Sequence, residues 1–98
     1  MRFEWDPAKA AANLADHGVA FEEARTVFGD VLTDTIFDEA RSTLDEERWL
    51  TMGMSDQSHL LVVWHVDLDE GEVVRIIGAR PATPRERRAY ESRQSSQY

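Results

Sequence analysis

The sequence lacks cysteine, which excludes a disulfide framework and any metal site built from thiolates. Its longest apolar run, residues 60–64, is far too short to cross a bilayer, and no apolar signal-peptide core stands near residue 1. It also contains no repeat and no linker-like stretch. With 98 residues and a hydrophobic fraction of 42%, we expect one domain spanning 1–98, located in the cytoplasm and making no membrane contact.

Positive charge is scarce and unevenly placed. The chain has 11 basic and 19 acidic residues, a net charge of −8, which disfavours nonspecific binding to nucleic acid. Residues 1–72 hold 17 acidic and 5 basic side chains (−12), whereas residues 73–98 hold 2 and 6 (+4). This asymmetry predicts a basic patch that binds phosphate, centred on Arg87 and Arg88. The alternative is a solvated basic helix with no ligand.

The N-terminal region predicts a helix over about residues 7–17. Asp6 suits the N-cap position, and Gly18 suits a left-handed helix end. Helical spacing places three polar side chains on one stripe: Lys9, Asn13 and His17. This stripe is either a partner-binding surface or, for His17, a structural group at the helix end.

The rest of the chain predicts an α+β fold with two N-terminal helices, a mainly antiparallel sheet of three to four strands, and a C-terminal helix. The second helix is expected at about 21–28, and the strands at 33–38, 46–54, 60–66 and 73–79. Residues 38–47 form an acidic loop. Thr83 and Glu86 have the spacing of a capping box and predict where the last helix starts. Residues 93–98 are expected to fray.

Strand pairing determines which side chains share a sheet face. If residues 69–71 form a three-residue loop, Leu68 pairs with Glu72 and His65 lies opposite Arg75. A tight turn on the other side of the central strand places Arg48 or Trp49 next to His65. One of these registers collects Arg48, His65 and Arg75 on one face, and a shift of one residue breaks this cluster.

Short motifs along nearly the whole chain form a recognisable set. They are Phe3-Glu4-Trp5-Asp6, Lys9, Asn13, His17-Gly18-Val19, Phe21-Glu22-Glu23-Ala24, Glu47-Arg48-Trp49, Arg75-Ile76-Ile77, Ala79-Arg80, Glu86-Arg87-Arg88 and Tyr90-Glu91. As a set they resemble the BrnT family, the toxin half of a bacterial type II toxin–antitoxin system. The resemblance implies a RelE-like fold with helices on one face of the sheet and the active site on the other.

The same resemblance implies a ribonuclease that cleaves RNA and inhibits translation. It also implies a cognate BrnA-like antitoxin, a ribbon-helix-helix dimer, through which alone the toxin would reach operator DNA. Two positions depart from the family pattern: Asp16, where the family usually has a basic residue, and Ala20, where it usually has Ser or Thr. Asp16 and the acidic net charge keep open a degenerate toxin that acts only as a protein-binding module.

The predicted sheet-face cluster suits metal-free RNA cleavage. The reaction needs proton transfer at the 2′-hydroxyl and the 5′-oxygen, and cations that stabilise the phosphorane. We therefore predict these catalytic residues: His65, Arg48, Arg75 and Arg80. Trp49 is predicted to stack on a base, with Arg87 and Arg88 binding RNA phosphate.

Each of these assignments has a structural alternative. In the structural alternative, His65 is a satisfied histidine in a central strand, Arg48 pairs with the acids at 45–47, and Arg80 caps the helix junction. The sequence has no HExxH motif and no paired-histidine spacing, so we expect neither a metal nor a cofactor.

Overall fold

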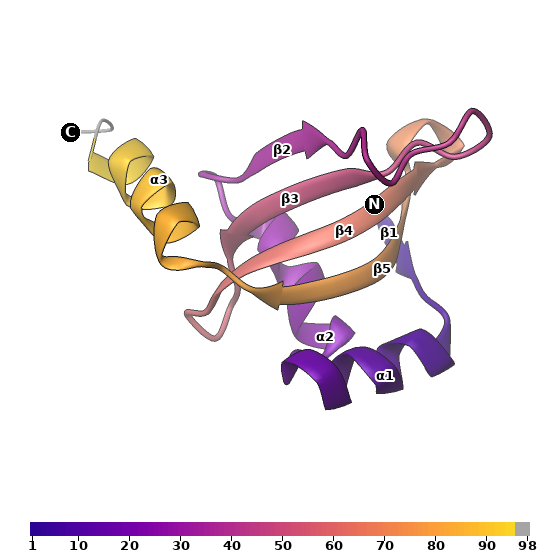
Figure 1. Cartoon of the computed structure of the whole chain (residues 1–98), viewed down its shortest axis with the longest axis horizontal. Helices are drawn as coiled ribbons and strands as arrows, with labels where there is room; N and C mark the ends of the chain where they lie inside the picture. Colours follow the sequence, from indigo (N-terminus) through magenta and orange to yellow (C-terminus); the bar gives the residue numbers. More distant parts are fainter. Residues whose placement is uncertain (96–98) are drawn as a thin grey trace.

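The computed structural model describes residues 1–95, and its central feature is a five-stranded mixed sheet (Figure 1). The strands are β1 (Arg2–Glu4), β2 (Asp34–Phe37), β3 (Trp49–Met54), β4 (Leu60–Leu68) and β5 (Val73–Pro81). Their order across the sheet is β1-β5-β4-β3-β2. The pairs from β2 to β5 are antiparallel, and β1 joins β5 in parallel.

The helices begin and end where local chemistry predicts. In α1 (Pro7–His17) the Asp6 carboxylate accepts the Ala8 N–H at 2.8 Å, and Gly18 ends the helix with φ of 69°. The short α2 (Phe21–Ala24) continues as a 3₁₀ helix, η1 (Arg25–Gly29). Before α3 (Pro84–Ser95), Thr83 donates its N–H to Glu86 at 2.8 Å and accepts the Glu86 N–H at 3.2 Å. The predicted capping box is therefore present.

The predicted α+β class and the order of the elements are confirmed. All four predicted strands occur, and the sheet gains β1, a three-residue strand too short to show a pattern of its own. The second helix is shorter than predicted, because half of residues 21–28 adopt the 3₁₀ form. Residues 93–95 belong to α3 rather than a frayed end, and the rest of that prediction concerns residues 96–98, outside the described part.

One face of the sheet packs against α2 and η1. Phe21, Ala24 and Val27 from these helices are fully buried. Three strand residues complete the centre of this core: Leu61, Val63 and Ile76. Gly53 lets η1 approach, since a Cβ atom there would lie 2.9 Å from Val27 Cγ1. The close packing of α2 and η1 on this face leaves the other face of β3, β4 and β5 as the place for a site.

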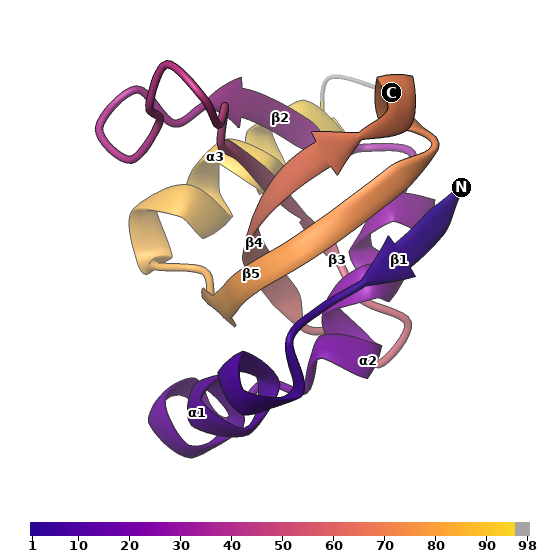
Figure 2. The ribbon, with the colours of Figure 1, turned by 90° about the vertical axis from the view of Figure 1, so that its right-hand side faces the viewer.

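The remaining elements frame the opposite face. Figures 1 and 2 show α1 and α2 lying together, whereas α3 lies apart, beyond the end of β5. The acidic loop between β2 and β3 projects at the other end of the long axis, away from α3 (Figure 1). Among the helices of residues 1–95, none has the length and apolar composition needed to cross a membrane.

Candidate functional site

Trp64 is the centre of the candidate site. Its neighbours in β4, Val63 and His65, are buried on the helix-covered side, so alternation directs Trp64 to the opposite face. There the guanidinium carbons of Arg80 and Arg41 lie 5.5 and 5.8 Å from the Trp64 ring centre. Both distances are within the range of a cation–π interaction. The arrangement brings together a loop residue, a β4 residue and a β5 residue.

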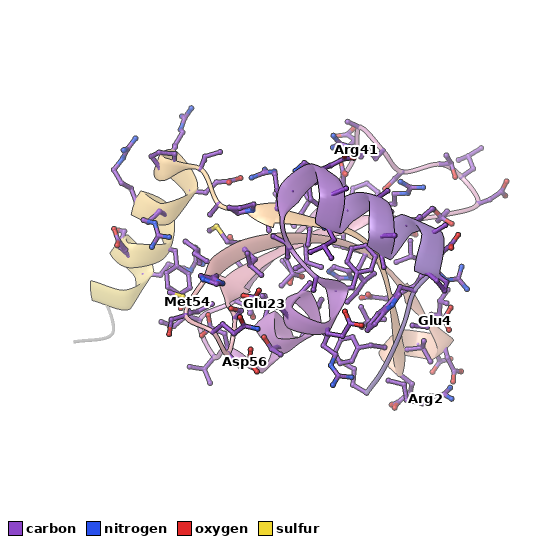
Figure 3. The ribbon with its side chains drawn as sticks, turned by 90° about the horizontal axis from the view of Figure 1, so that it is seen from below. Arg2, Glu4, Glu23, Arg41, Met54 and Asp56 are labelled. Carbon is purple, nitrogen blue, oxygen red and sulfur yellow. The ribbon has the colours of Figure 1, made fainter. Side chains whose placement is uncertain are left out.

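A hollow of about 190 Å³ opens beside this ring, which we call the Trp64 hollow. It is lined by Asn13, His17, Arg41, Arg48, Trp64, Ile77 and Gly78. Figure 3 shows Arg41 next to α1, which supplies the first two of these residues. Three segments far apart in sequence therefore meet at one concave surface: the end of α1, the acidic loop, and the middle of β4 and β5.

A β-bulge shapes the floor of the Trp64 hollow. Trp64 pairs with Gly78, but the next residue, His65, pairs with Ile76, so Ile77 is an extra residue in β5. A Cβ atom on Gly78 would lie 3.4 Å from the Trp64 ring. Glycine at 78 therefore leaves the indole room to lie against the strand.

The arginines of the site are oriented by acidic partners. Arg48 donates from Nε to Glu46 at 3.0 Å, and Arg41 donates to Asp38 at 3.4 Å. Arg80 makes a two-pronged pair with Glu86 at 2.8 and 3.0 Å. The hydrogen bonds from Arg80 hold the pKa of Glu86 at about 2, and those to Glu86 raise the pKa of Arg80.

Two of these arginines keep donors for a ligand. Within residues 1–95, the terminal nitrogens of Arg48 make no hydrogen bond, and Arg41 uses a single nitrogen. The alternatives raised for Arg48 and Arg80, an acidic neighbour and a contact at the helix junction, are thus both present in the structure. Because the Arg48 pair uses only one edge of the guanidinium, structural and ligand-binding roles are compatible.

His17 supplies a titratable group at the rim of the hollow. It is the last residue of α1 and is exposed, and within residues 1–95 its ring nitrogens make no hydrogen bond. Imidazole is the side chain that most often transfers protons in enzyme sites. Arg41, Arg48 and His17 together offer two fork-shaped cations and one proton-transfer group beside an aromatic ring.

His65 lies elsewhere, inside the core. Its side chain is 2% exposed, and its Nε2 and Nδ1 atoms lie 2.7 Å from Thr51 Oγ1 and Asp67 Oδ1. The Phe28 ring packs against it with 5.0 Å between ring centres. Burial lowers the pKa of His65, and the Asp67 carboxylate opposes part of this effect. These contacts satisfy both ring nitrogens.

The predicted Arg48–His65–Arg75 cluster is wrong, because the register differs by one residue. Leu68 pairs with Val73 rather than with Glu72, and His65 therefore lies opposite Ile76. The connection takes four residues because Asp69 and Glu70 adopt positive φ values of 52° and 54°. Arg75 consequently faces the other side of the sheet, where its Nε donates to Glu4 at 2.7 Å.

Trp49 is placed differently from the predicted stacking surface. It pairs with His65 in register, and its ring packs edge-on against Phe37 at 5.2 Å. The adjacent hollow is lined by four acidic residues: Asp45, Glu46, Glu47 and Asp67. Such surroundings repel phosphate and disfavour the predicted stacking role of Trp49, which stays a prediction.

The polar stripe of α1 is divided between two roles. Asn13 is 8% exposed, donates to the Val19 carbonyl at 2.9 Å and accepts the Ala79 N–H at 3.0 Å. Strand β1 pairs with β5 only as far as Arg75, so Asn13 satisfies an edge donor that has no strand partner. Asn13 is thus a structural residue, whereas Lys9 and His17 are exposed and stay predicted partner contacts.

The basic residues of α3 lie outside the Trp64 hollow. Arg87 and Arg88 are both exposed, and their predicted RNA contacts stay predictions. Sequence reasoning missed Arg41 and the central position of Trp64. Arg41 stands alone in an irregular acidic loop, where no periodic signal marks it. In the described part of the chain, no group of three His, Cys, Asp or Glu side chains is arranged to hold a metal ion.

The chain is similar to known proteins of one family. A family model described as "Ribonuclease toxin, BrnT, of type II toxin-antitoxin system" matches residues 5–86. The crystal structure of the Brucella abortus ribonuclease toxin, BrnT, is similar to this one with a TM-score of 0.63 and 20% sequence identity. The match covers 85% of this chain and 97% of the Brucella chain, and at this identity it shows a shared fold. None of the curated proteins compared with the chain matches it.

Proposed function

The chain belongs to the BrnT family of ribonuclease toxins from type II toxin–antitoxin systems, and we propose that it cleaves RNA in the Trp64 hollow without a metal ion. The observation that carries this proposal is the convergence of Arg41, Arg48 and Arg80 around Trp64, with His17 at the rim. An aromatic ring offers a base a stacking surface, and arginine forks fit phosphate oxygens.

The proposed reaction is attack of a ribose 2′-hydroxyl on the adjacent phosphorus. The O2′–P bond forms, the P–O5′ bond breaks, and a proton moves from O2′ to a base while another reaches O5′. His17 performs one of these proton transfers. Arg48 and Arg41 stabilise the charge that develops on the phosphorane oxygens. The products are a 2′,3′-cyclic phosphate and a 5′-hydroxyl end.

Two earlier candidates have no part in this mechanism. His65 and Arg75 do not line the Trp64 hollow, and both have partners that account for their positions. A catalytic role for either residue stays a prediction of the sequence. Arg80 acts here by lying over the Trp64 ring, which it holds in place, and by adding positive charge.

The biological role follows from the family. We propose that RNA cleavage in the cytoplasm stops translation until a cognate BrnA-like antitoxin, a ribbon-helix-helix dimer, covers the open sheet face. Operator DNA would be bound only through that complex. Finding a small reading frame of ribbon-helix-helix character beside the gene would support this partner.

The test is cleavage of RNA by the purified protein in EDTA. We expect 2′,3′-cyclic phosphate ends and a loss of about 10²-fold or more in His17→Gln, which cannot transfer protons near neutral pH. Arg48→Lys keeps the charge but loses the fork, so we expect a loss of about 10-fold. Arg75→Lys is the matched control. Because Arg75 lies on β5 outside the hollow, this variant should cleave RNA like the wild type.

A strict requirement for a divalent metal would contradict the metal-free mechanism. The alternative function, a degenerate toxin that only binds its partner, predicts antitoxin binding without RNA cleavage or growth arrest. It is supported by the acidic partners of all three arginines and by the net charge of −8. Induced expression of the chain alone, followed by growth and RNA integrity, separates these two functions.

A further inference from the structure

We propose that a second hollow, next to the Trp64 hollow, binds the neighbouring phosphate of the same RNA strand. This His59 hollow has a volume of about 260 Å³ and a rim that includes His17, Glu23, His59 and Arg87. The proposal rests on the proposed RNA-binding function of the Trp64 hollow and extends it by one nucleotide.

The two hollows are adjacent because His17 lines both of them. This residue is the last of α1, and the chain turns away at Gly18 with φ of 69°. The imidazole therefore stands between the hollows, with Trp64 on one side and His59 on the other. A single-stranded RNA with one phosphate at His17 would extend into both hollows.

His59 is held in place by a carboxylate. Its Nδ1 lies 2.7 Å from Glu23 Oε2, and the same oxygen accepts the Ser55 hydroxyl at 2.6 Å. Figure 3 shows Glu23 beside Met54, which ends β3, and Asp56 in the turn that follows, away from Arg2 and Glu4. The Glu23 carboxylate is only 10% exposed, while the His59 side chain is 62% exposed.

This geometry leaves one ring nitrogen for a ligand. With Nδ1 donating to Glu23, Nε2 is the outer nitrogen, and within residues 1–95 it has no hydrogen-bond partner. One carboxylate oxygen of Glu23 accepts two hydrogen bonds, from the Ser55 hydroxyl and from the His59 ring. The carboxylate therefore orients the imidazole, and His59 presents the donor or acceptor toward the rim.

Arg87 supplies the permanent cation of this hollow. It lies in the first turn of α3, and within the part of the chain that the structure describes its guanidinium makes no hydrogen bond or ion pair. The helix that carries it is anchored, because the Tyr90 hydroxyl donates to Asp30 at 2.7 Å. An unpaired arginine on an anchored helix can bind a phosphate oxygen without first breaking an ion pair.

The floor of the His59 hollow is apolar. Leu60 and Pro81 contribute to it, and only 2% of the Leu60 surface is exposed. A rim of nitrogen donors over an apolar floor matches a nucleotide, whose phosphate is anionic and whose ribose and base present apolar faces.

The first experiment uses NMR signals of the three histidines during titration with a short single-stranded DNA. DNA lacks the 2′-hydroxyl and so stays uncleaved. We expect the His17 and His59 signals to shift together, while the buried His65 acts as an internal control and stays unchanged. A shift at His17 alone, or at neither residue, would overturn the proposal. A His59 shift with inorganic phosphate but not with DNA would also overturn it, in favour of a free-phosphate site.

The second experiment measures the affinity for the same uncleaved single-stranded DNA as a function of salt concentration, in the wild type and two matched variants. Removing one phosphate contact from a single strand reduces the slope of log K against log salt by about 0.7. We expect this change in Arg87→Gln, together with an affinity about 10-fold weaker at low salt. Arg85→Gln removes the same charge from the same helix but lies outside the hollow, so its slope should match the wild type. Equal slopes in all three proteins would overturn the proposal.

The ribonuclease function and the phosphate site in the His59 hollow can be disproved independently. Wild-type protein that binds DNA at both histidines but never cleaves RNA overturns the ribonuclease function and keeps the second hollow. Protein that cleaves RNA without any response of His59 or Arg87 overturns the second hollow and keeps the ribonuclease.

Discussion

At the scale of single residues, the three histidines occupy three different environments. His17 is exposed at a helix end, His59 is exposed but tied to Glu23, and His65 is enclosed by Thr51, Asp67 and Phe28. Imidazole chemistry is the same in each case, so the surroundings decide the role. Enclosure on both ring nitrogens favours a structural role for His65, and open nitrogens favour ligand binding at the other two.

His65→Gln tests the structural role directly. The variant loses well-placed hydrogen bonds in the core, so we expect the free energy of unfolding to fall by about 2 kcal/mol. Cleavage per folded molecule should be unchanged. Denaturant titration with a cleavage assay checks both. Normal stability combined with lost cleavage would instead support the catalytic role predicted from the sequence.

The protonation of His65 also links stability to pH. Burial holds its pKa below the ordinary value of 6.5, so below about pH 6.5 the unfolded chain takes up a proton that the folded protein resists. We expect its contribution to stability to be present above this pH and to be lost as the pH falls through the folded-state pKa. Unfolding measured between about pH 7 and pH 5 should show a smaller slope in His65→Gln than in the wild type.

Asn13 is the other residue whose role changed once its surroundings were known. Asn13→Leu leaves the Val19 carbonyl and the Ala79 N–H without their partner, so we expect a loss of about 2–3 kcal/mol in the free energy of unfolding. Lys9→Ala, one turn earlier on the same stripe, is the control and should change stability little. Equal midpoints of denaturation for both variants would contradict the structural role of Asn13.

At the scale of elements, the junction of β5 and α3 links the fold to the site. Glu86 closes the capping box with Thr83 and, with its two carboxylate oxygens, also binds Arg80. Arg80 in turn lies over Trp64. The start of the last helix therefore positions a cation at the candidate site, although no described residue of α3 lines the Trp64 hollow.

Glu86→Gln tests this junction. The pKa of Glu86 is depressed from 4.5 to about 2, chiefly by the Arg80 hydrogen bonds, so its stabilisation is complete above about pH 4.5 and is lost as the pH falls toward 2. After allowance for solvent screening we expect a difference of about 1–2 kcal/mol between wild type and variant near pH 6, and roughly half of it or less near pH 3. Glu91→Gln on the same helix is the control. A difference that is the same at both pH values would contradict this origin.

At the scale of the whole molecule, a net charge of −8 surrounds a small cationic site. Four acidic residues line the hollow next to Trp49, whereas Arg41 and Arg48 line the hollow next to Trp64. Long-range repulsion of RNA is therefore combined with short-range attraction at the arginines. A basic partner would be attracted to the molecule generally, which suits tight neutralisation by an antitoxin.

A complex with the antitoxin should be stable and should protect part of the sheet from solvent. If the antitoxin covers the open sheet face, the complex should survive gel filtration, and hydrogen exchange should slow within residues 46–80. Exchange measured on free and complexed protein provides the comparison. Unchanged exchange rates throughout residues 46–80 would contradict this contact and would point instead to the surface of α1 that carries Lys9 and His17.

The sequence by itself determined the features that depend on neighbours along the chain. The caps at Asp6, Gly18 and Thr83, and the order of helices and strands, follow from interactions across a few residues. Membership of Arg48 and Arg80 in the candidate site was likewise predictable, because both belong to motifs of the family. The parallel strand β1 was not, since three residues without a pattern become a strand only when β5 offers an edge.

Only the tertiary structure decided which side chains meet. A four-residue turn after Leu68 shifted the register by one and sent His65 and Arg75 to opposite faces, and a bulge between Trp64 and His65 added a further residue to β5. The same packing brought His17, Arg41 and Trp64 together from three distant segments. Local preferences cannot determine these contacts, because a strand pairs in alternative registers until the core chooses between them, and an irregular loop acquires its position only from the surface on which it rests.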